Sequence, residues 1–596
     1  MRSLRHVNKY FLKYKRHFIF GLIFAALSNL FAVFPAQSVR VAINLVQQNL
    51  DVYKLFEGSE MQPAVNSQVG YVLLYFSGLV LLFAVIKGLF MFFMRQTLIV
   101  MSRHIEYDMK NEIYTHYQKL SLSFYRVHST GDLMARISED VGRVRMYIGP
   151  AIMYSMNLAG AIVVVLWAMF SVNAKLSSYV LLPLPFLSYS IFVVNNIIHK
   201  KSDAIQSQLS KVNSFVQQAY SGIRVIKSFA VEKYSEEDFQ TYADEYKKRS
   251  LSLAKVDATF FPLMVFLTGL SNLITIFIGG MMVISGEISI GNIAEFVIYI
   301  NLLTWPVAAF GVVISMTQRA AASQDRITEF LNTKPGIVSE NTGPFRFDHS
   351  IEFRNVSFRY PEKTAFALKN ISFKIDKGET LAILGRTGSG KSTIVQLLLR
   401  MMDATEGEIL IDQKNIKDVN LESFRELTGY VPQDVFLFSD TLSNNIAFAV
   451  SGHGKNLEQD VKEATDDAAL TSNIADFPEG LNTLVGERGV TLSGGQKQRV
   501  SIARALIKKP ELLILDDCLS AVDNKTESEI LENLKPVLRD KTAVIISHRV
   551  SSVKDANRIL VIDNGQIAET GSHEELMKQP GLYASLYQRQ LLEEAA

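Results

Sequence analysis

Six long apolar segments within the first 320 residues constrain this fold more than any other feature of the sequence. Each is long enough to cross a bilayer, because a membrane-spanning helix needs about 20 predominantly apolar residues. The segments lie at about 18–46, 69–94, 148–172, 176–198, 260–284 and 290–316. Later residues lack such runs, so one half of the chain is expected in lipid. Residues 1–320 are predicted to form an all-α six-helix transmembrane domain, in which Phe34-Pro35 marks a bend.

The positively charged residues predict which side of the membrane each connection faces. Lysines and arginines crowd the residues before the first segment, the connection between segments two and three, and the connection between segments four and five. The remaining connections are acidic or very short. Cytoplasmic loops carry an excess of Lys and Arg. We therefore expect a multi-pass protein of the cytoplasmic (inner) membrane, with both termini and the C-terminal domain in the cytoplasm.

The two cytoplasmic connections are each about 50 residues long, and the first has an apolar residue on every helical turn. These residues are Ile105, Met109, Ile113, Tyr117 and Leu120. The spacing predicts membrane helices that continue into the cytosol and reverse at turn-prone patches near Ser129 to Asp132 and Ala219 to Gly222.

A few residues within the apolar segments are candidates for substrate contact. Lys87 and Glu295 both lie toward a segment end, where a position at the membrane interface is the simpler interpretation. Trp305-Pro306 either kinks a pore-lining helix or simply packs. None of them identifies a substrate.

After a linker over 321–347, residues 348–596 alternate apolar strands with helical stretches, which predicts an α/β domain built largely on parallel strands. A GxxxxGKS motif lies between a strand-like and a helix-like stretch, the context that identifies a phosphate-binding loop. Its residues are Gly385, Arg386, Thr387, Gly388, Ser389, Gly390, Lys391 and Ser392, followed by Thr393. Backbone N–H groups close around the phosphates, Lys391 reaches the β and γ phosphates, and Ser392 ligates magnesium. ATP and Mg²⁺ are the expected cofactors.

Two further strand ends carry polar side chains. The apolar run Leu512 to Leu515 ends at Asp516-Asp517, and Asp516 is placed to hold magnesium through water. The run Thr542 to Ile546 ends at Ser547-His548. Because a parallel sheet builds its site at strand ends, we expect these side chains beside the phosphate loop. The net charge of +2 gives no basic stripe, so no nucleic-acid partner is expected.

One motif resembles the signature of a known family. LSGGQ at Leu492, Ser493, Gly494, Gly495 and Gln496 is similar to the signature of ABC ATPases. The family order continues through FRYP with Tyr360, VPQ with Gln433, TLVGERG at Thr483 to Gly489, LLILDD, Ser520 to Asp523, and His548. In the membrane half, SFYRVHSTGDLMARISEDV and SGIRVIKSFAVE resemble the intracellular loops of bacterial ABC exporters of the lipid-flippase and multidrug type. The resemblance implies a half-transporter whose ATPase domain also has an antiparallel β subdomain and a helical subdomain.

The resemblance also implies a role for each matching residue. Tyr360 would stack on adenine, Gln433 would contact magnesium and the attacking water, and His548 would contact the γ-phosphate. The metal would then be held by Ser392, Gln433 and Asp516, and the catalytic residues would be Asp517, His548 and Gln433. The signature residues would contact ATP bound to a second protomer, which requires a dimer. Glu487 and Asp523 would communicate across that dimer, and the predicted turns would couple the membrane helices to the ATPase domains.

One position departs from the family pattern. Most members place glutamate after the magnesium aspartate as general base, whereas this chain has Asp517, one methylene shorter. Such aspartates resemble the weakened sites of heterodimeric exporters, so we favour a heterodimer with a second half-transporter over a homodimer. The lone cysteine, Cys518, excludes an intrachain disulfide and is expected near the dimer interface, open to a bulky thiol reagent.

These inferences predict ATP-driven export or flipping of an amphipathic or hydrophobic substrate, such as a lipid or drug, across the cytoplasmic membrane. ATP binding would close a dimer of ATPase domains, hydrolysis would reset it, and the membrane domain would alternate access. Membrane lipids and a small amphipathic substrate are the other expected partners. The alternative is a weakly hydrolysing regulatory or partner subunit of a heterodimeric ABC complex.

Overall fold

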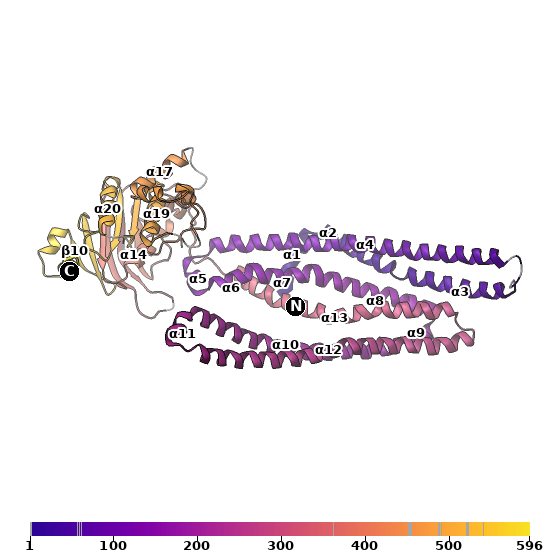
Figure 1. The fold of residues 1–596 in the computed structure, drawn as a ribbon. Coiled ribbons are helices and arrows are strands. Elements are labelled where there is room, and N and C mark those ends of the chain that lie inside the picture. Colours follow the sequence, from indigo (N-terminus) through magenta and orange to yellow (C-terminus); the bar gives the residue numbers. More distant parts are fainter. Residues whose placement is uncertain are drawn as a thin grey trace. The chain divides into compact units, whose positions relative to one another are not determined.

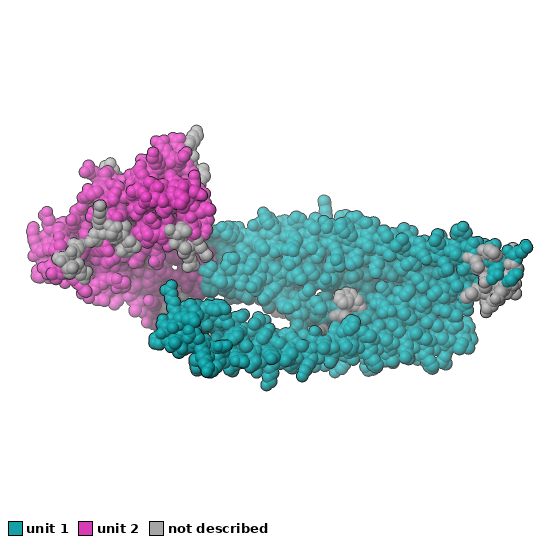
Figure 2. All heavy atoms as spheres, in the orientation of Figure 1, with its two compact units in different colours: residues 1–118, 129–333 teal, residues 119–128, 334–596 magenta. Residues whose placement is uncertain are grey.

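The computed structural model describes residues 3–55, 58, 60, 62–361, 363–450, 456–486, 489, 492–519, 524–539 and 541–595. The chain divides into two compact units, coloured separately in Figure 2. Unit 1 holds residues 1–118 and 129–333, and unit 2 holds residues 119–128 and 334–596. The described residues of unit 1 are helical, and unit 2 contains the sheets. The predicted architecture, a helical domain joined to a domain with β sheets, is confirmed.

Four helices of unit 1, α4, α10, α12 and α13, are much longer than a bilayer crossing (Figure 1). The longest, α4, has 58 residues, which at about 1.5 Å per residue gives a length of roughly 87 Å. After a 3-10 turn at Ser3–Val7, the helices are α1 (Asn8–Lys13), α2 (Lys15–Leu30), α3 (Phe34–Leu55), α4 (Gln62–Lys119), α6 (Thr130–Ala135), α7 (Val141–Met146), α8 (Ile152–Val172), α9 (Ala174–Leu181), α10 (Pro183–Ser221), α11 (Ile223–Phe229), α12 (Glu232–Ile284) and α13 (Ile290–Leu331). Two π-helical turns, Arg136–Asp140 and Tyr147–Ala151, flank α7. The lengths of α4, α10, α12 and α13 leave room for the predicted helical extensions beyond the membrane.

All six predicted segments are helical, with local interruptions. By length and composition, four helical stretches of the described chain can cross a membrane: Lys15–Asn49, Ser67–Lys119, Thr130–Val172 and Glu232–Ile284. A shorter apolar stretch, Ile290–Thr304, begins α13. The first segment breaks at residues 31–33, immediately before Pro35, because proline lacks the N–H that a continuous helix needs and fits the first turn of α3. The predicted bend is confirmed.

Apolar packing explains how the helices of unit 1 associate. Helices α10 and α12 run side by side (Figure 1), and α13 packs against α3, α8 and α12. The core between them includes the fully buried Phe296, Tyr299 and Ile300 of α13. On α4, by contrast, none of its most apolar window is buried within the chain. Such an apolar surface requires lipid or another protein chain as its neighbour.

The first helix reversal lies beside its predicted turn, whereas the second begins within its predicted patch, at Gly222, the C-cap of α10. The first contains the short helix α5 (Leu122–Val127), and Gly131 and Asp132 already belong to α6, whose N-cap is Ser129. The second surrounds α11, and Ala219 still belongs to α10. Residues 119–128, including α5, cluster with unit 2. We call residues 119–128, which lie directly upstream of the predicted turn, the coupling segment.

Unit 2 contains two sheets among its described residues. The first is antiparallel, with strand order β2-β1-β4-β5, and is the predicted antiparallel β subdomain. The second has the order β10-β9-β3-β8-β7-β6, parallel except for β10. The strands are β1 (Ser350–Phe358), β2 (Leu368–Asp376), β3 (Thr380–Gly385), β4 (Glu406–Ile411), β5 (Lys414–Asn415), β6 (Thr428–Val431), β7 (Leu512–Asp516), β8 (Thr542–Ser547), β9 (Arg558–Asp563) and β10 (Gln566–Gly571).

Besides α5, the helices of unit 2 pack around these sheets and include the predicted helical subdomain. They are α14 (Lys391–Leu398), α15 (Leu421–Glu426), α16 (Leu442–Ala447), α17 (Leu457–Asp467), α18 (Thr471–Ala475), α19 (Gly494–Leu506), α20 (Asn524–Leu538), α21 (His573–Met577) and α22 (Leu582–Ala595), with 3-10 turns at Ile416–Asp418, Phe448–Val450 and Gly480–Asn482. Helices α16, α17 and α19 pack against one another, and their apolar faces share a core with β7.

The parallel register positions the site. Asp516 of β7 pairs with Ile546 of β8, and Leu384 of β3 pairs with Ser547 of β8. The carboxyl ends of three neighbouring strands therefore meet at one edge of the sheet, followed by the phosphate loop, Asp517 and His548.

Candidate nucleotide-binding site

The phosphate loop joins β3 to α14. Gly390 is the N-cap of α14 with φ +104°, a conformation that glycine adopts without a steric penalty. Nζ of Lys391 donates to the carbonyl oxygens of Gly385 and Arg386, over 2.8 and 2.9 Å, which folds this side chain back over the loop. Burial lowers the pKa of Lys391, and the charges of Asp517 and Asp516 oppose that effect. The loop thus combines an amino group with the N-terminus of a helix, a suitable combination for phosphate.

A cavity of about 420 Å³ opens over this loop. Among the predicted site residues, it is lined by Tyr360, Thr387, Gly388, Gly390, Lys391, Ser392, Thr393, Gln433, Asp516, Asp517 and His548. Gly385, Arg386 and Ser389 belong to the loop but do not line the cavity. Residues brought together from five separate parts of unit 2 therefore surround a single volume.

Two of the three ligands proposed for magnesium, Ser392 and Asp516, contact each other in the lining of the cavity, whereas Gln433 contacts Asp517. Oγ of Ser392 donates to Oδ1 of Asp516 over 3.0 Å. Burial raises the pKa of Asp516 to about 6, and the nearby Asp517 adds to the rise while the hydrogen bond from Ser392 opposes it. Within the described ranges, no group of three or more His, Cys, Asp or Glu side chains could hold a metal by itself. A hydroxyl and a carboxylate fit Mg²⁺ that also binds nucleotide phosphates, since this ion usually takes one or two protein ligands there.

The predicted catalytic residues form one hydrogen-bonded cluster. Nδ1 of His548 lies 2.7 Å from Oδ1 of Asp517, and Nε2 of Gln433 donates to Oδ2 of the same carboxylate over 3.2 Å. Burial by itself raises the pKa of Asp517, but the hydrogen bond from His548 and the charge of Lys391 outweigh it and hold the pKa below its ordinary value. Asp517 has φ +49°, an unusual backbone conformation for a residue other than glycine. Such strain is common at functional sites.

The signature residues lie elsewhere in unit 2. Ser493 is the N-cap of α19: its side chain accepts from the backbone N–H of Gln496, and the Gln496 side chain accepts from the N–H of Ser493. Leu492 and Gly495 are buried, whereas Ser493 and Gly494 are exposed. None of these five residues lines the cavity. Glu487 and Asp523, predicted to act in dimer communication, lie outside the described residues.

The expectation that Cys518 is open to a bulky thiol reagent is wrong. Its side chain is only 3% exposed and packs in the core with Leu515 and Leu519. Burial raises the pKa of the Cys518 thiol to about 12, so little thiolate forms near neutral pH. Asp517 lines the cavity, whereas the next residue, Cys518, does not.

Sequence reasoning missed several residues around Tyr360. Lys363, Ala365, Phe366 and Ala367 line the same cavity. Arg126, from the coupling segment, lies over the Tyr360 ring with 4.7 Å between its guanidinium carbon and the ring centroid. Arg126 is the basic residue of the SFYRV stretch, but nothing in the spacing of that stretch predicts a contact with Tyr360.

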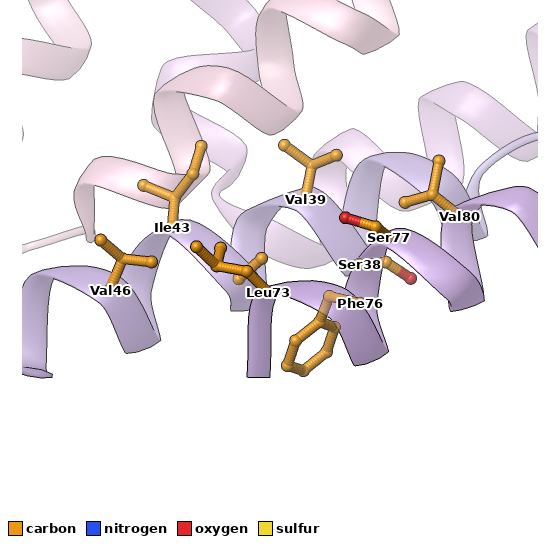
Figure 3. Close-up of a pocket in the computed structure, with 9 residues that line it drawn as sticks. Ser38, Val39, Ile43, Val46, Leu73, Phe76, Ser77 and Val80 are labelled. Atoms are coloured by element: carbon orange, nitrogen blue, oxygen red, sulfur yellow. The ribbon is translucent and has the colours of Figure 1, made fainter. Parts of the chain in front are cut away.

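Unit 1 has a cavity of its own, between α3 and α4 (Figure 3). Its volume is about 420 Å³, and its lining is apolar apart from the hydroxyls of Ser38 and Ser77. The other lining residues are Val39, Ala42, Ile43, Val46, Leu73, Phe76 and Val80. Lys87 and Glu295 are not among them. Glu295, expected at an interface, is fully enclosed by the helices and lies 3.2 Å from Nη1 of Arg40.

Comparisons with known proteins agree for both units. Residues 18–307 match the family described as ABC transporter transmembrane region, and residues 368–520 match the family described as ABC transporter. The chain is 36% identical over 490 residues to the probable multidrug resistance ABC transporter ATP-binding/permease protein YheI of Bacillus subtilis (strain 168), covering 82% of this chain and 83% of that protein. It is 32% identical over 517 residues to the ATP-dependent lipid A-core flippase of Syntrophus aciditrophicus (strain SB), covering 86% and 85%.

A solved structure extends the similarity to the whole fold. The structure of a bacterial Atm1-family ABC exporter with ATP bound superposes with a TM-score of 0.75 at 26% identity, covering 96% of this chain and 99% of that one. The predicted resemblance is confirmed, and with it an ATPase domain that binds ATP and couples its hydrolysis to transport. The chain belongs to the ABC transporter family, as a multi-pass membrane exporter of the multidrug and lipid-flippase type.

Proposed function

We propose that this chain is a half-transporter that moves an amphipathic or hydrophobic molecule outward across the cytoplasmic membrane. The observation that carries this proposal is the convergence of Lys391, Ser392, Asp516, Asp517 and His548 on one cavity, in a chain whose other unit consists of long apolar helices. The names of its relatives, a multidrug resistance transporter and a lipid A-core flippase, favour a lipid or an amphipathic drug. The cavity between α3 and α4 is apolar with two hydroxyls in its lining, which suits the binding of an amphipathic molecule.

In this proposal each residue of the nucleotide cavity has one task. Lys391 binds the β and γ phosphates, and Tyr360 stacks on adenine. Ser392, Asp516 and Gln433 hold Mg²⁺, which neutralises charge on the phosphates when bound. His548 contacts the γ-phosphate. Asp517 accepts the proton of the attacking water, which requires its carboxylate to be ionised, and its lowered pKa favours that form.

The proposed dimer follows from where the signature lies. Ser493 and Gly494 are exposed and do not line the chain's own cavity. They are therefore available to ATP held by a second protomer, and the pair completes two nucleotide sites. ATP binding would close the two ATPase domains, and hydrolysis would reopen them. Membrane helices that continue into the coupling segments would convert this closure into alternating access.

We favour a heterodimer. Asp517 stands where a glutamate would reach one methylene farther, and a misplacement of about 1 Å can cost on the order of 100-fold in rate. A partner with glutamate at the matching position would supply the fast site. The excess of Lys and Arg in the long connections favours a cytoplasmic location for both termini and the ATPase domain.

The test is transport by the purified chain in proteoliposomes, with and without a co-purifying partner. We expect ATP-dependent movement of a fluorescent phospholipid or a lipophilic dye, and loss of that movement in the Lys391→Ala variant. ATPase activity that no lipid or drug alters, without movement of any probe, would contradict the transport proposal.

A second candidate function is a regulatory subunit that binds ATP but hydrolyses little. The short Asp517 carboxylate, engaged by both His548 and Gln433, favours this alternative. The two proposals differ in one measurement. A regulatory subunit would change the transport rate of its partner while its own Lys391→Ala variant leaves that transport running.

A further inference from the structure

Arg126 connects the coupling segment to the two elements that hold the nucleotide. Its guanidinium carbon lies 4.7 Å from the centroid of the Tyr360 ring, within the range of a cation–π interaction. Its Nη2 donates to Oε1 of Gln396 over 3.1 Å. Gln396 belongs to α14, the helix that begins at the phosphate loop. One side chain of residues 119–128 therefore touches both the tyrosine and the phosphate-loop helix.

Tyr360 lines two cavities of unit 2. One is the nucleotide cavity. The other has a volume of about 340 Å³ and is lined by Ser123, Arg126, Val127, Tyr360, Pro361, Lys363 and Met402. Tyr360 and Lys363 line both cavities, whereas Arg126 lines only the second. The guanidinium therefore lies over the Tyr360 ring without lining the nucleotide cavity.

Further contacts fix the orientation of the ring. The Tyr360 hydroxyl lies 2.9 Å from Oγ1 of Thr393, and Phe358 meets the ring edge-on with centroids 4.9 Å apart. With Arg126 on one face, the ring is held before any base arrives. A ring that is already ordered loses less side-chain entropy when adenine stacks on it, so binding is tighter.

We propose that Arg126 is a positioning residue for nucleotide recognition, which holds Tyr360 for adenine and makes docking of residues 119–128 depend on the base. The inference rests on the proposed role of Tyr360 in adenine stacking. Because linkage between two binding events is reciprocal, adenine on Tyr360 strengthens the docking of the coupling segment by the same factor by which Arg126 strengthens adenine binding. The membrane helices joined to this segment would thus respond to the base as well as to the phosphates.

The first experiment measures nucleotide affinity of the full chain in lipid nanodiscs. The ligands are a non-hydrolysable ATP analogue and inorganic tripolyphosphate, each with Mg²⁺. Arg126→Ala should weaken binding of the ATP analogue about three- to tenfold, the size expected for an arginine–aromatic contact, and leave tripolyphosphate binding unchanged. Arg126→Lys should lose less affinity for the ATP analogue than Arg126→Ala, because the positive charge remains and only the planar stacking group is gone.

Two further variants keep the test decisive. Gln396→Ala should also weaken binding of the ATP analogue, but by less than Arg126→Ala does. Arg126 remains in this variant and loses only the hydrogen bond that orients it. Arg354→Ala is the matched control: it removes a half-exposed arginine of unit 2 that pairs with Glu352 and Glu408 and lines neither cavity, and both affinities should stay unchanged. If Arg126→Ala does not fold, Arg126→Lys and Gln396→Ala carry the comparison.

Other outcomes overturn the inference and separate it from the proposed function. Tighter ATP binding in Arg126→Ala would mean that arginine and adenine compete for the ring. Equal weakening of both ligands would mean a general charge effect, and no change in either would mean no role. In each of these cases the proposed nucleotide site still holds if the wild-type chain binds the ATP analogue and Lys391→Ala does not. If the wild-type chain binds neither ligand, the proposed function itself is refuted.

The second experiment follows the coupling segment. Hydrogen exchange of residues 119–128 should slow when the ATP analogue binds and stay unchanged with saturating tripolyphosphate. Tyr360→Ala should abolish the difference between the two ligands, because the ring is the only proposed connection between base and segment. Protection by tripolyphosphate equal to that by the ATP analogue would refute the link to the base.

Discussion

Nδ1 of His548 lies 2.7 Å from Oδ1 of Asp517, so the histidine expected to contact the γ-phosphate touches the carboxylate expected to act as base. Because an ionised carboxylate only accepts hydrogen bonds, the proton of this contact belongs to Nδ1. Gln433 donates to the other oxygen. The position of the carboxylate is therefore set by two neighbours as well as by its own short side chain.

Lengthening this side chain tests whether its reach limits hydrolysis. Asp517→Glu should raise the steady-state ATPase rate of the purified chain about tenfold or more, the order expected when a general base is restored to its position. A rate that stays the same or falls would mean that chain length is not what limits the site.

Removing the carboxylate distinguishes the two kinds of dimer. In a heterodimer Asp517→Ala should change the ATPase rate little, because the partner carries most of the turnover. In a homodimer the same variant loses the base at both sites and hydrolysis stops. Rapid hydrolysis by the wild-type chain alone, lost in Asp517→Ala, would overturn our preference for a heterodimer.

Lys391→Ala should weaken ATP binding at this chain's own site and remove transport that depends on it, because the β and γ phosphates lose their cationic partner. Binding of a fluorescent ATP analogue measures the effect directly. The matched control is Lys374→Ala, which removes an exposed lysine paired with Asp376 on the antiparallel sheet and should leave binding intact. Unchanged affinity in Lys391→Ala would refute the assignment of the phosphate site.

Cys518 should resist thiol reagents in the folded chain. The thiol is buried, and its pKa of about 12 leaves almost no thiolate at pH 7.5. A maleimide should therefore label the denatured chain quickly and the native chain at least about 100-fold more slowly, with ATPase activity retained. Mass spectrometry of the intact protein gives both rates. Fast labelling of the native chain would mean that the segment after β7 opens.

Features encoded over short stretches of chain were predictable. The phosphate loop needs only a strand, a glycine-rich turn and a helix, and these lie within residues 380–398. Likewise the runs that end at Asp516 and Ser547 read as buried strands because they are short and continuously apolar. Once these strands were placed as parallel neighbours, the meeting of Asp517 and His548 followed from the fold.

Two kinds of feature were not predictable: the role of a residue that suits a turn and a helix start equally well, and the pairing of distant residues. The turn-like Ser129 to Asp132 proved to be a helix start, since a serine that initiates a turn is equally suited to cap a helix. The Arg40–Glu295 pair joins residues 255 positions apart, and no periodicity in one helix indicates a partner on another. For the same reason, neither the sequence around Arg126 nor the sequence around Tyr360 predicts their contact.

The Arg40–Glu295 pair anchors a polar network between α3 and α13. Oε1 of Glu295 accepts from the Tyr299 hydroxyl over 2.8 Å, and Oε2 lies 3.2 Å from Nη1 of Arg40. Nearby, the side chain of Asn44 donates to Ser289 and accepts from the backbone N–H of Gly291. Glu295 is completely enclosed, whereas the Arg40 side chain is 30% exposed. The carboxylate is therefore the member of the pair that cannot turn to water.

This asymmetry predicts how the pair responds to mutation. Arg40→Ala should destabilise the chain by about 1–3 kcal/mol, because it leaves a buried carboxylate without its cation. Adding Glu295→Gln to Arg40→Ala should recover part of that loss, since the amide oxygen can still accept from Tyr299 and needs no counter-charge. The measurement is thermal unfolding of the wild type, Arg40→Ala, Glu295→Gln and the double variant, in one detergent and with identical lipid content. If the double variant is as unstable as the sum of the two single variants, the residues act independently, and α3 and α13 are held together by their apolar packing alone.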